Sequence, residues 1–170
     1  IIMPLWQRLL LRHGRPGHGS EWLFFDTFLR GRVMQRLHNL RDQPGSRLLL
    51  VALPGRCREL ELLVTGLLVN PVDAAVHVLG IGQTLEELPQ VCAKMQPVAV
   101  VVFSNQAPGA DTPQILERLA LSLECPVAVV GEGADLLEDS FRGSPIACLG
   151  SEGRLIRRRL RQFLAGRLDT

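Results

Sequence analysis

The side chains that could do chemistry in this chain are four histidines, four cysteines and one serine at the end of an apolar run. None of the histidines stands at metal-ligand spacing from a cysteine or carboxylate: His13, His18, His38 and His77. The cysteines are far apart and form no Cys-x-x-Cys pair. Ser104 lacks the Gly-x-Ser-x-Gly turn of a hydrolase nucleophile. These patterns predict neither a catalytic nor a metal site, and we expect a protein that is not an enzyme.

Phosphate binding and phosphate transfer are weakly supported. Gly80-Ile81-Gly82 lacks the third glycine of a dinucleotide loop and the Lys-Ser/Thr pair of a P-loop. A phospho-receiver domain needs acidic residues where its first and third strands end, but the corresponding apolar runs end in Leu53-Pro54 and Phe103-Ser104. The net charge of +2 is too small to indicate that the chain itself binds nucleic acid.

From residue 48 onward, strand-like apolar runs alternate with helix-like segments, which predicts a parallel sheet with helices on both faces. We expect strands at 48–53, 74–79, 98–103, 127–130 and 146–149. Right-handed crossovers between them give an α/β, flavodoxin-like sandwich with strand order 2-1-3-4-5. Thr84 and Glu87 have the spacing of a helix capping box, and Ser151 is expected to cap the last helix.

Two helix-like segments, at 3–13 and 20–40, precede this sheet and are separated by a Gly/Pro-rich turn. We therefore expect the C-terminal part of a helical bundle at 1–44 and an α/β domain at 45–170. The chain opens inside a helix pattern without a secretory leader, so we expect it to be cut from a longer protein. No apolar run reaches about 20 residues, and the scattered cysteines favour a reducing compartment, which predicts a cytoplasmic protein without a membrane span.

Two stretches resemble a known family. The segment from Leu53 through Pro54-Gly55 to Leu63 resembles the first loop of cobalamin-binding domains. Phe24 and the run Leu29-Arg30-Gly31-Arg32-Val33 look like the tail of a motif in the helical bundle that precedes such a domain. With this layout, the chain resembles the C-terminal effector domain of MerR-family transcription regulators, including light-sensing repressors.

The resemblance implies that five positions which hold cobalamin in the family have changed. Arg58 stands where the loop would supply an imidazole to cobalt, and Glu61 replaces the usual glycine. In the bundle motif, Arg12 takes the place of a tryptophan, while Trp22 and Leu23 take the place of Glu-His. An arginine stays protonated and has no free lone pair for a metal. We therefore expect no cofactor, and we expect the bulky Trp22 and Leu23 to fill the vacated space.

Two further sets of residues have open interpretations. The resemblance places one set where the family's slot for the cofactor's nucleotide tail lies, although these residue types are also common at strand-to-helix turns: Gly80, Ser104, Gly131 and Gly133. The other set concentrates aromatic area within two helical turns and is either bundle core or a surface for another protein: Trp22, Phe24, Phe25 and Phe28.

The resemblance implies an effector domain of a bacterial transcription regulator that self-associates as a dimer. DNA would be bound only by an N-terminal helix-turn-helix module that this chain lacks. Control would come from a regulatory protein partner, as in relatives that respond to small flavin-based light sensors. Two alternatives stay open: a cobalamin-binding sensor or corrinoid carrier with unusual ligation, and a sensor of another small metabolite.

Overall fold

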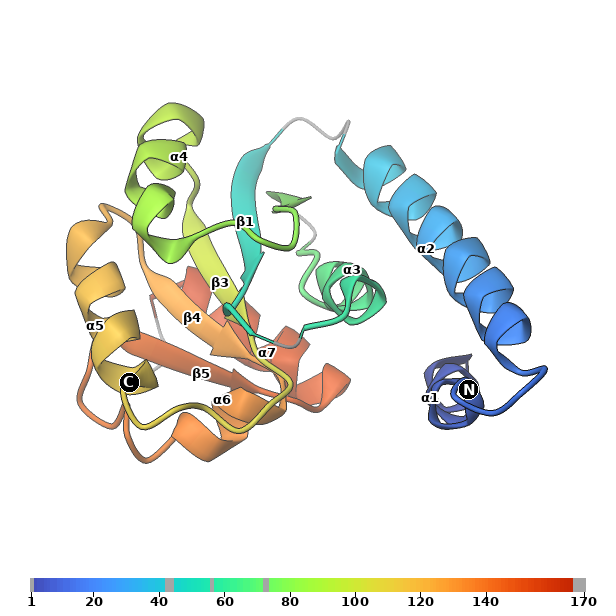
Figure 1. Cartoon of the computed structure of the whole chain (residues 1–170). Helices are drawn as coiled ribbons and strands as arrows, with labels where there is room; N and C mark the ends of the chain where they lie inside the picture. The colour runs from blue at the N-terminus through green and yellow to red at the C-terminus, as the bar shows by residue number, and fades with distance from the viewer. Residues whose placement is uncertain (1, 42–44, 56, 72–73, 167–170) are drawn as a thin grey trace.

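The structure is a computed structural model that describes residues 2–41, 45–55, 57–71 and 74–166. Its centre is a five-stranded parallel sheet with the strand order β2-β1-β3-β4-β5 (Figure 1). The strands are β1 Ser46–Ala52, β2 Ala74–Val78, β3 Ala99–Phe103, β4 Val127–Val130 and β5 Ile146–Gly150. The flavodoxin-like fold and the predicted strand order are confirmed.

The central strand, β3, is the most apolar and β-branched run of the chain, and every one of its residues is buried. Such a run suits a strand that is covered on both faces. Its neighbour β1 also alternates its side chains between the two faces, so that Leu48 and Leu50 pack on one side and Leu49 on the other. The sheet therefore separates two apolar cores.

Helices cover the two faces. One face carries α3 Glu59–Leu68 and α7 Gly153–Leu164, and the other carries η1 Leu85–Glu87, α4 Leu88–Met95, α5 Thr112–Ser122 and α6 Glu132–Leu137. In α7 the side chains of Ile156 and Leu160 are buried against the sheet. Its outer face is arginine-rich and exposed: Arg154, Arg157, Arg158 and Arg161.

Thr84 is an N-cap residue as predicted but without the bonds of a capping box, and the cap predicted at Ser151 is displaced by one residue. Thr84 precedes the short helix η1 and makes no side-chain capping bond, while the Glu87 carboxylate accepts a bond from Gln83 Nε2 at 3.1 Å. The residues after Thr84, from Leu85 to Glu87, form one 3₁₀ turn, and the α-helix begins only at Leu88. At the last helix, the N-cap residue is Glu152, one position after Ser151.

A helical hairpin, α1 Ile2–Arg12 and α2 Gly19–Arg41, lies beside the sheet domain (Figure 1). Gly17, with φ of +86°, turns the chain between the helices. The hairpin packs around the buried Trp6, and α2 contacts α3 and β2. A Cβ atom on Gly66 of α3 would lie 2.8 Å from Val78 of β2 and 3.3 Å from Leu37 of α2, so glycine permits this close packing.

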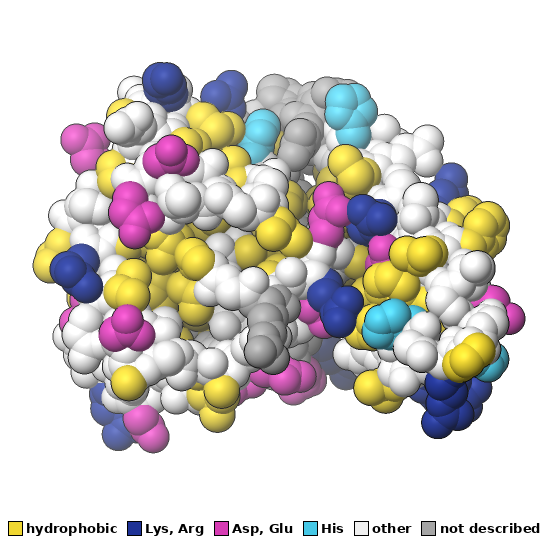
Figure 2. Space-filling view, viewed as in Figure 1, with side chains coloured by type: hydrophobic (Ala, Val, Ile, Leu, Met, Phe, Trp, Pro, Cys, Tyr) yellow, Lys and Arg dark blue, Asp and Glu magenta, His cyan; other side chains and the backbone are white. Residues whose placement is uncertain are grey.

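The predicted boundary between residues 44 and 45 lies at the edge of 42–44, outside the described residues. The space-filling view shows apolar side chains on the hairpin as well as on the sheet domain (Figure 2). Within the part of the chain that the structure describes, no helix has the length and apolar character needed to cross a membrane.

Candidate functional site at the junction of the hairpin and the sheet domain

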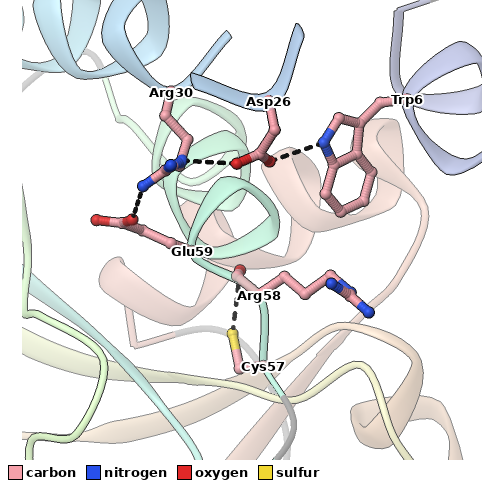
Figure 3. Close-up of polar contacts among 6 residues, drawn as sticks. All are labelled: Trp6, Asp26, Arg30, Cys57, Arg58 and Glu59. Carbon is pink, nitrogen blue, oxygen red and sulfur yellow. Dashed lines mark hydrogen bonds and ion pairs between the residues drawn. The ribbon is translucent and has the colours of Figure 1, made fainter. Parts of the chain in front are cut away.

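A chain of polar contacts joins α1, α2 and α3 (Figure 3). Trp6 on α1 donates from Nε1 to Asp26 Oδ1 at 2.8 Å. Arg30, one turn further along α2, donates from Nε to Asp26 Oδ2 at 2.9 Å and from Nη1 to Glu59 Oε2 at 2.6 Å. Because Glu59 is the first residue of α3, these contacts tie the hairpin to the sheet domain.

The buried charge in this chain of contacts is well compensated. Asp26 is buried, and both of its carboxylate oxygens accept hydrogen bonds, one of them from a cation. The hydrogen bond to Glu59, together with the charge of Asp26, raises the pKa of Arg30 above its ordinary value despite desolvation. A buried carboxylate that lost these partners would be strongly destabilising. We call the four connected residues the junction network: Trp6, Asp26, Arg30 and Glu59.

Arg58 and Trp22 meet directly in the same junction. Arg58 is the N-cap residue of α3 in an extended conformation, and its side chain projects away from the helix (Figure 3). Its guanidinium carbon lies 5.9 Å from the centroid of the Trp22 ring, within the range of a cation–π interaction. His13 and Trp6 also approach Trp22, with ring centroids at 5.3 and 6.3 Å. The buried Nε1 of Trp22 has no hydrogen-bond partner among the described residues.

The side chains at the other three changed positions lie in different surroundings. Glu61 accepts a hydrogen bond from the backbone N–H of Arg58 at 3.4 Å, which places a carboxylate at the positive end of α3. Arg12 is exposed at the end of α1. Leu23 is exposed on α2, whereas Trp22 is half-buried, so the two neighbouring side chains have different surroundings. The structure thus brings Trp22, Arg58 and Glu61 together.

The candidate ligand slot is not a single site. Gly131 has φ of +103°, and a Cβ atom there would lie 2.3 Å from Ser104 O. A Cβ atom on Gly133 would lie 2.5 Å from Ser104 Oγ, and the Gly133 N–H donates to Ser104 O at 2.8 Å. These two glycines therefore let the loops after β3 and β4 pack on each other. Gly80 lies elsewhere, in a cavity of about 220 Å³ between α2 and the sheet domain.

A larger cavity, of about 560 Å³, lies where the loops after β1 and β3 diverge. In the order 2-1-3-4-5 this is the point where the strand order reverses, which is where doubly wound folds bind ligands. Ser104 and Asn105 line it, together with the carboxylates of Glu86 and Asp111. Its described lining includes no lysine or arginine, so it offers no positive charge to a phosphate group.

The four aromatic residues of α2 divide between two surfaces. Trp22 and Phe25 pack against the buried Trp6 in the hairpin core. Phe24 and Phe28 lie on the opposite side of the helix and are exposed. Trp22 and Phe25 are therefore part of the hairpin core, while Phe24 and Phe28 are exposed to solvent.

The cysteines have the properties of structural thiols. All four are free. Burial raises the pKa of Cys57 and of Cys148 to about 11 and that of Cys92 to about 12, and it also raises the pKa of Cys125. A thiol with a raised pKa stays protonated near neutral pH and is a poor nucleophile. Within the described ranges, no cluster of three or more metal-ligating side chains is present.

The comparisons with known proteins bear on the fold. No family profile matches the sequence, and no curated protein matches it. Among solved structures, the protein is similar to a chain in the crystal structure of the methanol:cobalamin methyltransferase complex MtaBC from Methanosarcina barkeri. The match has a TM-score of 0.54 at 17% sequence identity and covers 78% of this chain, which spans about half of the other (52%). The two proteins therefore share a fold, and the fold found in that cobalamin enzyme complex is the one that the sequence resemblance implied.

Proposed function

We propose that this protein is a non-catalytic effector and oligomerisation domain of a MerR-like bacterial transcription regulator that works without cobalamin and is controlled through protein contacts. The observation that carries the proposal is the contact between Arg58 and Trp22. These residues occupy the two positions that face cobalamin from opposite sides in the family that the sequence resembles. A planar cofactor between them would have to separate two side chains that here lie within cation–π range of each other.

The residues at the junction do not fit cobalamin. Arg58 is a permanent cation and cannot donate a lone pair to cobalt. Glu61 replaces a glycine and is engaged in capping α3 through the backbone of Arg58. In the candidate slot for the nucleotide tail, Gly131 and Gly133 pack closely on Ser104. These features support the proposal that the domain works without cobalamin.

A regulatory rather than catalytic role is supported by the state of the nucleophilic groups. The thiols are held protonated by burial. Ser104 Oγ donates to Gln106 O at 3.3 Å. In such a domain the input would be a protein, such as the small flavin-based light sensors that the resemblance implies. DNA would be contacted by a helix-turn-helix module outside this chain, in the cytoplasm.

A second candidate function, a sensor of a small metabolite, is favoured by the cavity of about 560 Å³ where the strand order of the sheet reverses. With two carboxylates and no described basic side chain in its lining, it suits a small neutral or cationic metabolite. A thermal-shift screen of amines and neutral metabolites tests this, because a ligand at a hundred times its Kd adds about 2.7 kcal/mol of stability. If none of the compounds raises the melting temperature, this second candidate function is refuted.

The proposed function is tested in the source bacterium by transcript profiling with the gene intact and deleted, each with and without cobalamin in the medium. We expect deletion to change a defined set of transcripts by the same factor in both media. An unchanged transcript profile after deletion would refute the regulatory role. A deletion effect that depends on cobalamin would refute the loss of the cofactor.

A further inference from the structure

The outer side of α7 carries a narrow stripe of positive charge. Four exposed arginines follow one another at spacings of three and four residues, and we call them the arginine stripe: Arg154, Arg157, Arg158 and Arg161. With 3.6 residues per turn, they fall within roughly 100° of the helix circumference and extend over about 10 Å of its length. The opposite side packs on the sheet through Ile156, Leu160 and Phe163. The fold thus gathers four cations on one surface of a chain whose net charge is only +2.

The arginine stripe lacks a counter-charge among the described residues. None of its members forms an ion pair with a described carboxylate, and α7 itself contains no acidic residue. The hydrogen bond from Arg161 Nε to Arg157 O, at 3.4 Å, leaves both positive charges uncompensated. By contrast, Arg159 on another side of the same helix pairs with Glu138 at 2.9 Å. The neighbouring carboxylate therefore neutralises Arg159 and leaves the stripe unpaired.

This arrangement is unfavourable for the free protein. Each member of the stripe has another member three or four positions away, and like charges at these spacings destabilise a helix. Arg154 is also the second residue of α7, near the positive end of the helix dipole, where a cation is unfavourable. A bound polyanion would relieve both effects. The stripe therefore has the properties of a surface that is completed by negative charge.

The surroundings of the stripe favour phosphate groups over a membrane or another protein. A membrane-binding helix inserts its apolar side among lipids, but that side of α7 is buried against the sheet. A protein interface has an apolar or aromatic centre, whereas the one exposed residue of α7 outside the stripe is Gln162. Guanidinium groups form planar, bidentate contacts with phosphate oxygens. Duplex DNA carries one negative charge for about each 1.7 Å of its axis, so the stripe can contact several phosphates at once.

We propose that the arginine stripe of α7 binds the phosphate backbone of duplex DNA. Such contacts position a protein on the duplex but carry no sequence information. In the proposed regulator, the helix-turn-helix module outside this chain would read the sequence, and α7 would hold the DNA beside it. The inference rests on the proposed function for this setting. Absence of DNA binding by the purified chain overturns the inference alone, whereas an unchanged transcript profile after gene deletion overturns the regulatory role alone.

Fluorescence anisotropy of a labelled duplex, titrated with the full chain, tests the proposal. We expect saturable binding at about 50 mM salt and a Kd that rises about 12-fold for each doubling of salt, as four phosphate contacts require. A second duplex of unrelated sequence should give the same Kd within about twofold, because phosphates are alike at every base pair. No binding by the native chain up to hundreds of micromolar, or a Kd that depends strongly on sequence, would overturn the proposal.

Two variants of equal total charge test whether the stripe itself is responsible. The first replaces the stripe: Arg154→Gln, Arg157→Gln, Arg158→Gln and Arg161→Gln. The matched control replaces four exposed arginines on α1, α2, β1 and α5: Arg8→Gln, Arg36→Gln, Arg47→Gln and Arg118→Gln. We expect the Kd for DNA to rise at least about 10-fold in the first variant, with a much weaker salt dependence, and less than about 3-fold in the control. Equal weakening would show that total charge drives binding and would overturn the proposal.

A competition experiment separates DNA from an acidic protein as the partner. Unlabelled duplex should displace the labelled duplex from the native chain, whereas polyglutamate at the same concentration of charge should displace it only weakly, since it has a lower charge density and no phosphate groups. Displacement by polyglutamate that equals displacement by unlabelled duplex would overturn the assignment to DNA. Far-UV circular dichroism of each variant confirms that the fold is retained.

Discussion

Replacing Asp26 by alanine tests the junction network most sharply. The change leaves the Trp6 Nε1–H without an acceptor in a buried position, which costs about 1.5–3 kcal/mol for a bond to a charged group. The pair with Arg30 contributes less than about 1 kcal/mol, because Arg30 is about one-third exposed and keeps Glu59 as a partner. We therefore expect Asp26→Ala to lower the free energy of unfolding by about 3 kcal/mol, or Tm by about 6–12 °C for a protein of this size.

The assay uses the two tryptophans, which both lie on the hairpin in a chain without tyrosine. Tryptophan fluorescence during urea unfolding reports on the junction, and far-UV circular dichroism reports on the whole fold. We expect the Asp26→Ala fluorescence transition to move to lower urea by at least as much as the circular dichroism transition. Separation of the two curves would show that the hairpin detaches before the sheet domain unfolds.

The matched control for this experiment is Asp139→Ala. Asp139 also pairs with an arginine, at 2.8 Å from Arg142, but both side chains are almost fully exposed. Such surface pairs contribute little, so the control should change stability by less than about 0.5 kcal/mol. A loss below about 1 kcal/mol for Asp26→Ala, or a loss equal to that of the control, would refute the role of the junction network.

Three other predictions concern single positions. Gly131→Ala forces a side chain into positive φ and against Ser104 O, so we expect it to lower the free energy of unfolding by at least about 3 kcal/mol. The control Gly143→Ala, also at positive φ but in open space, should lower it by about 1 kcal/mol. Urea titration measures both values. Burial raises the pKa of Cys57 from 9.0 to about 11, so between these pH values the folded protein keeps a proton that the unfolded chain releases. The contribution of the Cys57 thiol to the free energy of unfolding should therefore be constant below pH 9 and disappear between pH 9 and 11. In Cys57→Ser, the free energy of unfolding should decline less steeply over this range. Arg58→Ala should cost only about 0.5–1 kcal/mol but shift the Trp22 emission, and an unchanged spectrum would contradict the stacking.

The sheet could be predicted from the sequence because its strands are short apolar runs between clear turn residues. The run that forms β3, for example, has no polar position from Ala99 to Phe103 and fits no half-exposed element. Helix starts were less predictable, because the spacing of Thr84 and Glu87 suits both a capping box and a 3₁₀ turn. Only the local backbone distinguishes these two.

The candidate site could be predicted only in part. The changed positions Arg58 and Trp22 were identified one by one, but their contact depends on how α2 packs on α3, which no local pattern specifies. Asp26 and Glu59 were missed. The spacing of Asp26 and Arg30 by four residues was a readable signal for an ion pair on one helix. Nothing in the local sequence indicates that Glu59, 29 residues later, joins it.

In the proposed function, Arg58 and Trp22 close the space where a cobalamin would lie. Calorimetric titration of the full chain with adenosylcobalamin and methylcobalamin, with the visible spectrum recorded at each step, tests it most directly. We expect no heat of binding and no change of axial ligation for the native protein, and the same for Arg58→His, because Trp22 still occupies the opposite side. Micromolar binding by either protein, with a spectral change at cobalt, would contradict the account.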